Sequence, residues 1–103
     1  MKAAIYARTA HSEQSTLSQI ELCREYIREQ KGTVVGVYDD EGSSAHDDDR
    51  DGLASLMTDA LTTSFDTVVV TGYDRLFRSH GKLQEFINQL GALKIELVAV
   101  KSL

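Results

Sequence analysis

Cysteine and proline are almost absent from this sequence of 103 residues, which has one cysteine, Cys23, and no proline. A single cysteine cannot form a disulfide within the chain, so we expect a cytoplasmic protein with Cys23 buried as a structural residue. Without proline, repeats or low-complexity segments there is no sign of a linker, and residues 1–103 are expected to form one domain. No apolar run approaches the roughly 20 residues that a membrane span needs, so we expect no membrane partner.

Basic residues are also in the minority, with 11 lysines and arginines against 16 aspartates and glutamates and a formal net charge of −5. Tight, free-standing nucleic-acid binding normally needs a basic surface, so this balance argues against it. A local cluster of arginines remains compatible with the composition.

Short apolar runs and helical repeats alternate along the chain. The runs rich in β-branched residues predict strands at 3–7, 33–38, 67–70 and 95–100. Apolar residues at helical spacing predict three helices between them, with faces formed by Leu17, Ile20, Cys23 and Ile27, by Leu53, Leu56, Met57, Ala60 and Leu61, and by Leu83, Phe86, Ile87 and Leu90. Strands that alternate with helices imply right-handed crossovers, so we predict an α/β fold with a mainly parallel four-stranded sheet flanked by helices, its strands covered on both faces.

In such a sheet the ligand site lies beyond the carboxyl ends of the strands. The segments that follow the first three strands contain four arginines: Arg8, Arg50, Arg75 and Arg78. A guanidinium has a rigid fork of N–H donors that matches phosphate oxygens, so four of them at one edge favour a phosphate site over chance.

Other phosphate-binding α/β folds fit the same segments less well. The stretch "ARTAHSEQ" after the first strand has no glycine, which excludes a dinucleotide-binding turn and a P-loop. A phospho-receiver would use Asp39 or Asp40, but an arginine ends the first strand where an acid would help. The acidic residues Asp47, Asp48, Asp49 and Asp51, next to His46, lack the spacing of a cation-binding loop, so we interpret them as solvated and expect no metal.

Three stretches carry a resemblance to a known family. "YARTAHSEQSTLSQIELCREY" is similar to the opening of serine recombinases, the resolvase and invertase family, which reads Y-A-R-x-S and then two glutamines. "DEGSSAHDDDRDGL" resembles the family's D-x-G-x-S-G … R-x-G-L segment, and "VVVTGYDRLFRS" resembles its V-V-V-x-x-x-D-R-L-x-R-S signature. The resemblance implies a resolvase-like three-layer fold and the catalytic domain of a site-specific DNA recombinase.

The resemblance also implies a mechanism in which a serine attacks a DNA phosphodiester and forms a 5′-phosphoserine, without metal or high-energy cofactor. Four arginines would contact the scissile phosphate: Arg8, Arg50, Arg75 and Arg78. Asp74 would orient them, Gln14 and Gln19 would support the loop, and Asp40 and Ser43 would line the pocket. In the full-length protein, DNA and further copies of the chain, as a dimer or tetramer, would be the partners.

The sequence departs from the family pattern at three places. The nucleophile falls at position 10, where this chain has Ala10, and a methyl group cannot attack phosphorus. Ser12 lies two residues further on and is better interpreted as a loop-ordering residue. A lysine that family members often carry is replaced by Thr71 or Gly72, and the chain stops at Leu103, before the family's long dimerisation helix and DNA-binding domain.

These departures leave more than one function open. The first is a recombinase catalytic domain that is inactive as written because of Ala10. The second is a non-catalytic interaction or regulatory module on the same fold, and a third, weaker one is a domain that binds small phosphorylated anions. In each case we expect Arg8, Arg75 and Arg78 to form one anion site with Asp74 as counter-ion, and Arg50, at the end of a loop, to stand away from them.

We predict that the 103-residue chain binds duplex DNA weakly and without sequence preference, because its net charge is negative and the base-reading segment implied by the resemblance is missing. A titration at physiological salt measures this. Specific binding tighter than about 10⁻⁸ M would show that base recognition lies within these residues.

Overall fold

Strands and helices alternate along the whole chain, as the spacing predicts. The computed structural model describes residues 1–9, 15–42, 50–62 and 65–102. The elements in chain order are β1 (Lys2–Arg8), α1 (Leu17–Glu29), β2 (Thr33–Asp40), α2 (Asp51–Thr62), β3 (Thr67–Val70), the 3₁₀ turn η1 (Tyr73–Arg75), α3 (His80–Ala92), β4 (Glu96–Ala99) and the 3₁₀ turn η2 (Val100–Ser102).

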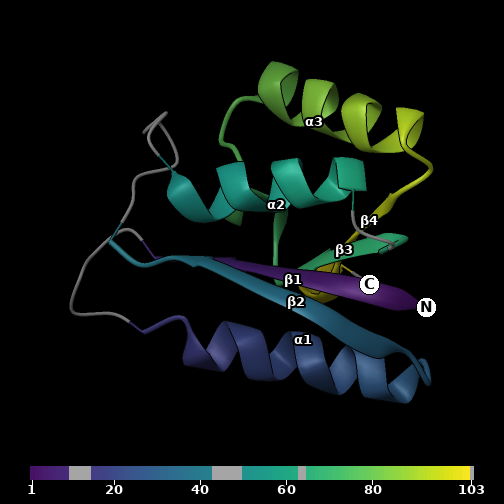
Figure 1. Cartoon of the computed structure of the whole chain (residues 1–103). Coiled ribbons are helices and arrows are strands. Elements are labelled where there is room, and N and C mark those ends of the chain that lie inside the picture. Colours follow the sequence, from purple (N-terminus) through teal and green to yellow (C-terminus); the bar gives the residue numbers. More distant parts are fainter. Residues whose placement is uncertain (10–14, 43–49, 63–64, 103) are drawn as a thin grey trace.

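The four strands form one parallel sheet in the order β2-β1-β3-β4. Helix α1 covers one face, and α2 and α3 cover the other, which gives three layers (Figure 1). The expected three-layer α/β fold is therefore confirmed. Within the described ranges, no helix has the length and apolar character to cross a membrane.

Strand β1 lies at the centre of the sheet and is buried from its second residue to its last. Side chains alternate between the two faces of a strand. Ala3, Ile5 and Ala7 pack toward α1, and Ala4 and Tyr6 pack toward α2 and α3. The alanines keep this strand thin, so the helices approach it closely, and two of its polar side chains, Tyr6 and Arg8, are buried.

The edge strand β2 differs from the expectation that strands are covered on both faces. Its residues alternate between exposed and half-buried, and a bulge at Val35 shifts the register against β1. Val35 and Val37 are exposed because an edge strand has a neighbour on one side alone. Two residues of the predicted helix faces are also exposed instead of buried. Leu17 is 68% and Leu61 71% exposed, since each lies in a terminal turn of its helix.

Cys23 lies on the buried face of α1, as predicted, and its thiol points at the carbonyl oxygen of Val69 on β3, with Sγ 3.8 Å from that oxygen. Burial raises the pKa of the thiol to about 12. The side chain therefore remains a neutral packing group at physiological pH.

The segment "RDGL" that begins α2 has its glycine for a steric reason. A Cβ at Gly52 would overlap the carbonyl oxygen of Asp39 and would lie 2.9 Å from Oδ1 of Asp40. A side chain here would push the start of α2 away from the end of β2, where the candidate site lies.

We predict that Gly52→Ala lowers the free energy of unfolding by about 1–3 kcal/mol, the usual cost of overpacking. Gly91→Ala is the matched control, because no atom lies within 4 Å of a Cβ there. Gly91 is in α3, so alanine should raise the free energy of unfolding by about 0.5–1 kcal/mol. Urea unfolding followed by circular dichroism measures both, and an unchanged Gly52→Ala midpoint would contradict the close approach.

Candidate active site

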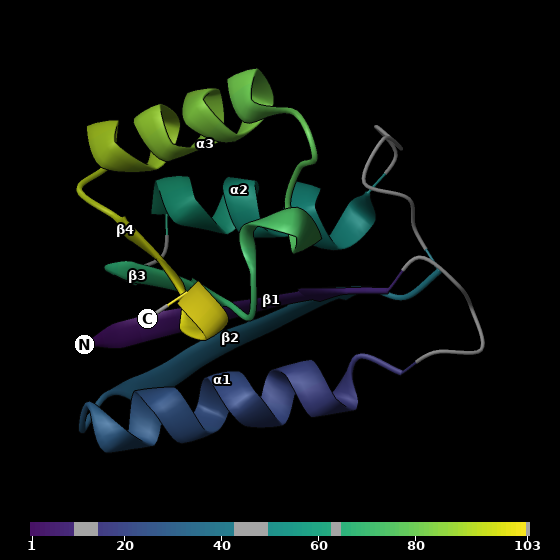
Figure 2. The ribbon, with the colours of Figure 1, turned by 180° about the vertical axis from the view of Figure 1, so that it is seen from behind.

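The end of β1 and the turn η1 are joined through two arginines. Arg8 is 3% exposed and donates from Nε to the carbonyl oxygen of Arg75 (3.0 Å) and from Nη2 to that of Asp74 (3.1 Å). Arg75 returns a bond from Nη1 to the carbonyl oxygen of Arg8 (3.3 Å). The structure thus brings these two arginines, 67 residues apart in the sequence, to one edge of the sheet. Figure 2 shows the segment between β3 and α3, which contains η1, beside β1.

Gln19 fixes the main chain at the same point. Its side-chain amide accepts from the N–H of Arg8 (3.2 Å) and donates to the carbonyl oxygen of Arg8 (2.8 Å). This two-point contact replaces the ladder bonds that a strand loses where it ends, so α1 holds Arg8 in place. The loop-supporting role that the family resemblance implies for Gln19 stays a prediction.

Arg50 is not where we expected it. Instead of standing away from the other arginines it is 4% exposed and lies among them. It donates from Nε and Nη2 to the hydroxyl of Tyr6 (3.2 and 2.8 Å), from Nη2 to the carbonyl oxygen of Arg75 (3.0 Å), and from Nη1 to that of Leu76. The guanidinium points inward because its acceptors, the Tyr6 hydroxyl and two carbonyl oxygens at the end of η1, lie there. The position of Arg50 in the sequence, at the end of a loop, does not predict this.

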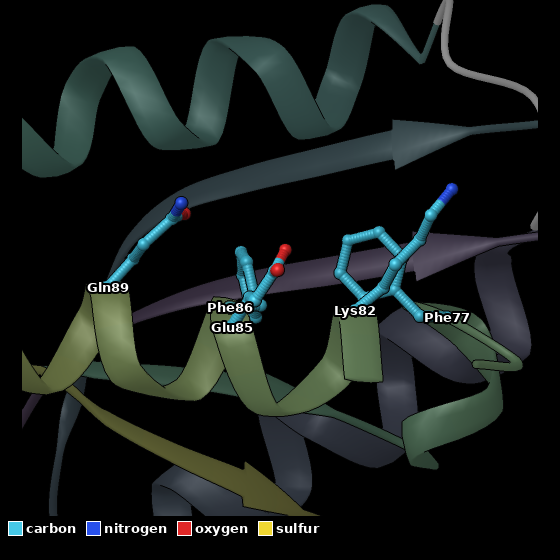
Figure 3. A pocket seen from close by; sticks show the side chains of 5 residues that line it. All are labelled: Phe77, Lys82, Glu85, Phe86 and Gln89. Atoms are coloured by element: carbon cyan, nitrogen blue, oxygen red, sulfur yellow. The ribbon is translucent and has the colours of Figure 1, made fainter. Parts of the chain in front are cut away.

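Aromatic rings complete the surroundings of Arg50. Its guanidinium carbon lies 5.4 Å from the ring centre of Tyr6 and 5.3 Å from that of Phe77, in the range of cation–π contacts. Phe77 also packs edge-on against Phe86 of α3, with ring centres 5.7 Å apart. Both rings line a shallow hollow along α3 together with Lys82, Glu85 and Gln89 (Figure 3).

Tyr6 is a buried residue to which the sequence analysis assigned no role, although it begins the stretch that resembles the family. Its hydroxyl donates to Oδ2 of Asp40 (2.7 Å) while it accepts from Arg50. Burial and then the Asp40 hydrogen bond raise the pKa of Tyr6 well above its usual range, although Arg50 opposes the rise. A tyrosine in an otherwise aliphatic central strand was the available signal, because a buried hydroxyl needs a partner.

Asp40 serves the scaffold in this structure. Besides the Tyr6 hydroxyl, its carboxylate accepts the N–H groups of Gly52 (2.7 Å) and Leu53 (3.0 Å) in the first turn of α2. A carboxylate at this position satisfies free N–H groups and favours the positive end of the helix dipole. We had expected Asp40 to line the pocket, but these bonds direct it to the start of α2.

The remaining predicted residues of η1 lie differently. Asp74 accepts a hydrogen bond from Arg8 through its main-chain carbonyl oxygen, and its carboxylate acts on Arg8 through its charge, which opposes the lowering of the pKa of Arg8 by burial. Arg78 is exposed and lines a second hollow with Tyr73, Phe77 and others. Within the described part of the chain no hydrogen bond joins it to the other arginines. Ala10, Ser12, Gln14, Ser43 and the acidic run 47–49 with His46 lie outside the described residues.

Three guanidinium groups therefore share a small volume at the carboxyl edge. Burial lowers the pKa of Arg8, and the positive charge of Arg50 and, less strongly, of Arg75 lowers it further, while Tyr6 and Asp74 partly offset the shift. An anion bound beside Arg8 would relieve this repulsion. The arrangement is suited to holding a phosphate and to stabilising negative charge that develops on it.

Comparison with known proteins gave one family and a consistent set of structures. The family described as "Resolvase, N terminal domain" matches residues 3–103. The N-terminal catalytic domain of TP901-1 integrase superposes with a TM-score of 0.91 at 28% identity, covering 99% of this chain and 78% of that one. The C-terminal catalytic domain of ISC1926 TnpA, an IS607-like serine recombinase, gives 0.91 at 28% identity, covering 98% and 70%.

A resolvase family site-specific recombinase from Streptococcus pneumoniae gives a TM-score of 0.87 at 20% identity, with 99% of this chain and 73% of that chain covered, which supports the fold alone. No curated protein sequence matches this one.

We predict that Asp40→Asn lowers the free energy of unfolding by about 1–3 kcal/mol, because an amide offers one accepting oxygen where three donors now converge on two. Asp39→Asn, next to it on β2, is the control: its carboxylate is exposed and accepts from the Thr16 hydroxyl, so the change should stay within about 0.5 kcal/mol. Denaturant unfolding measures both, and equal effects would contradict the capping role of Asp40.

Proposed function

Because the chain belongs to the resolvase N-terminal domain family, we propose that it is the catalytic domain of a site-specific DNA recombinase and is inactive as written. The domain spans residues 1–103, acts in the cytoplasm, and has DNA and further copies of the chain as partners in the full-length protein. The observation that carries this proposal is the contact of Arg8, Arg50 and Arg75 at the carboxyl edge of the sheet.

The chemistry that these residues support is phosphoryl transfer to a side-chain hydroxyl. A serine oxygen attacks the phosphorus of a DNA phosphodiester and gives up its proton, while the bond from phosphorus to the 3′ oxygen breaks. The 3′ oxygen takes up a proton and leaves as a hydroxyl, so the new 5′-phosphoserine bond conserves the energy of the broken one. Charge builds on the phosphate oxygens in the transition state. Guanidinium donors at Arg8 and Arg75, with Arg78 from the following segment, would stabilise that charge.

Position 10 is where the family resemblance puts the attacking serine, two residues beyond Arg8. Ala10 has no hydroxyl, so the phosphate would be bound without being attacked. Ser12 is a poor substitute for a serine at position 10. Productive attack needs the oxygen within about 3.5 Å of the phosphorus, and a hydroxyl two residues further along the chain would not lie at the same distance from a phosphate bound beside Arg8.

A second candidate function is a non-catalytic interaction or regulatory module on the same fold. The missing lysine at Thr71 or Gly72 and the acidic run 47–49 favour it. A module of this kind would keep the fold and need no phosphate contact, so the arginine edge separates the two candidates.

We predict that Ala10→Ser permits covalent attachment to DNA and that the chain with Ala10 shows none. The test incubates each protein, extended to full length, with its recombination site or with a pool of duplexes of varied sequence. Denaturing gels detect the adduct, and mass spectrometry of the digested adduct identifies the modified residue. The expected product is a phosphoserine at position 10.

Three variants in the Ala10→Ser background sharpen this test. Arg8→Ala should reduce adduct formation by about 100-fold or more, the scale for loss of a group that stabilises transition-state charge. Arg28→Ala, an exposed arginine in the last turn of α1, and Ser12→Ala should leave it unchanged. An adduct on Ser12, or any adduct in the chain with Ala10, would show that position 10 is not the nucleophile.

A further inference from the structure

Arg50 uses most of its hydrogen-bonding capacity inside the protein. An arginine has five N–H donors, and the four bonds of Arg50 go to the Tyr6 hydroxyl, twice, and to the carbonyl oxygens of Arg75 and Leu76. The aromatic rings of Tyr6 and Phe77 lie beside the same group. A guanidinium held in this way would have to break bonds to buried partners before it could grip a phosphate.

We propose that Arg50 is a positioning residue that holds η1 so that Arg75 is aligned with Arg8, and that the Tyr6 hydroxyl holds Arg50 in turn. The inference rests on the proposed function, because Arg8 and Arg75 are the arginines assigned there to the phosphate. It changes the role of Arg50, which the family resemblance gives as a direct phosphate contact.

The bonds of Arg50 explain how it acts on Arg75. The carbonyl oxygen of Arg75 accepts from both Arg50 (3.0 Å) and Arg8 (3.0 Å), so this one peptide group is shared by the two arginines. The bond to Leu76 fixes the next peptide group. With both carbonyls held, the main chain that carries the Arg75 side chain has a defined orientation against the end of β1.

Tyr6 can hold Arg50 because its hydroxyl is itself held by Asp40. Asp40 accepts the hydrogen bond that the hydroxyl donates, so the lone pairs of the hydroxyl oxygen are left to accept from Arg50. Asp40 is itself fixed by the N–H groups of Gly52 and Leu53. Gly52 follows Arg50 by two residues, so the bonds close a ring from Arg50 through the start of α2 and back through Asp40 and Tyr6. The ring sets the place of Arg50 without any ligand.

The protein offers a matched control for Tyr6. Tyr38 on β2 also donates its hydroxyl to an aspartate, Oδ2 of Asp59 on α2 (2.5 Å). Among the described residues, no arginine donates to the hydroxyl of Tyr38. Tyr38→Phe and Tyr6→Phe each remove one tyrosine–aspartate bond, and Tyr6→Phe alone also removes one of the three acceptors of Arg50, the hydroxyl that takes two of its four bonds.

The test follows the Nε–H signals of the arginines by ¹⁵N NMR while inorganic phosphate is added to the chain. We expect the signals of Arg8 and Arg75 to shift and that of Arg50 to stay and to exchange slowly with solvent. In Tyr6→Phe the Arg50 signal should exchange about tenfold faster, the Arg75 signal should move, and the dissociation constant for phosphate should rise about fivefold, the scale for one lost hydrogen bond. Tyr38→Phe should leave all three quantities unchanged.

An Arg50 signal that shifts with phosphate as far as that of Arg8 would overturn the proposal, and so would a Tyr6→Phe variant that behaves like Tyr38→Phe. If phosphate shifts no arginine signal, the anion site of the proposed function fails, and the exchange of Arg50 and the position of the Arg75 signal still decide the positioning role. Arg50→Lys keeps the positive charge but lacks the planar set of N–H donors that reaches Tyr6, Arg75 and Leu76 together. It should weaken phosphate binding as Tyr6→Phe does, and retained affinity would show that charge alone is sufficient.

Discussion

The hydroxyl of Tyr6 is the contact on which the carboxyl edge of this sheet depends. It lies on the central strand, in the interior, and joins an acid that caps α2 to an arginine that holds η1. A phenol can serve both sides, since it donates once and accepts twice. Strand, helix and turn are therefore registered against one another by one polar atom in an apolar core. Such a buried network is stabilising only when all its members are satisfied, and no described buried side-chain polar atom lacks a partner.

The arginines differ in role although they share one charge and one edge. Arg8 and Arg75 exchange bonds with each other's main chain and lie at the ends of β1 and η1. Arg50 is directed inward, and Arg78 is exposed beside a separate hollow. A count of arginines from the sequence treats all four alike. Their bonds set Arg50 apart, because its guanidinium is held by the Tyr6 hydroxyl as well as by main-chain carbonyl oxygens.

The order of strands and helices, the parallel sheet and the meeting of Arg8 with Arg75 followed from the sequence, because strand periodicity and the common edge of parallel strands are regular geometry. The place of Arg50 did not follow. Its acceptors are the carbonyl oxygens of residues 25 and 26 positions further along the chain, and no local pattern contains them. Tyr6 was overlooked for the same reason, since its partners are 34 and 44 residues away. The exposure of Leu17 and Leu61 depends on where each helix leaves the sheet, which spacing alone does not give.

The acceptors at η1 are main-chain carbonyl oxygens of residues 74, 75 and 76, and this has a consequence for how the edge responds to its surroundings. A carbonyl oxygen carries a partial charge and does not titrate, so these bonds hold the guanidinium groups without cancelling their charge. Side chains can vary at these positions while the acceptors stay, because every residue type supplies a carbonyl oxygen. The arginines thus keep their positive charge while the backbone fixes their positions, and the reach of that charge into solvent is limited by salt, with a screening length of about 8 Å at physiological ionic strength.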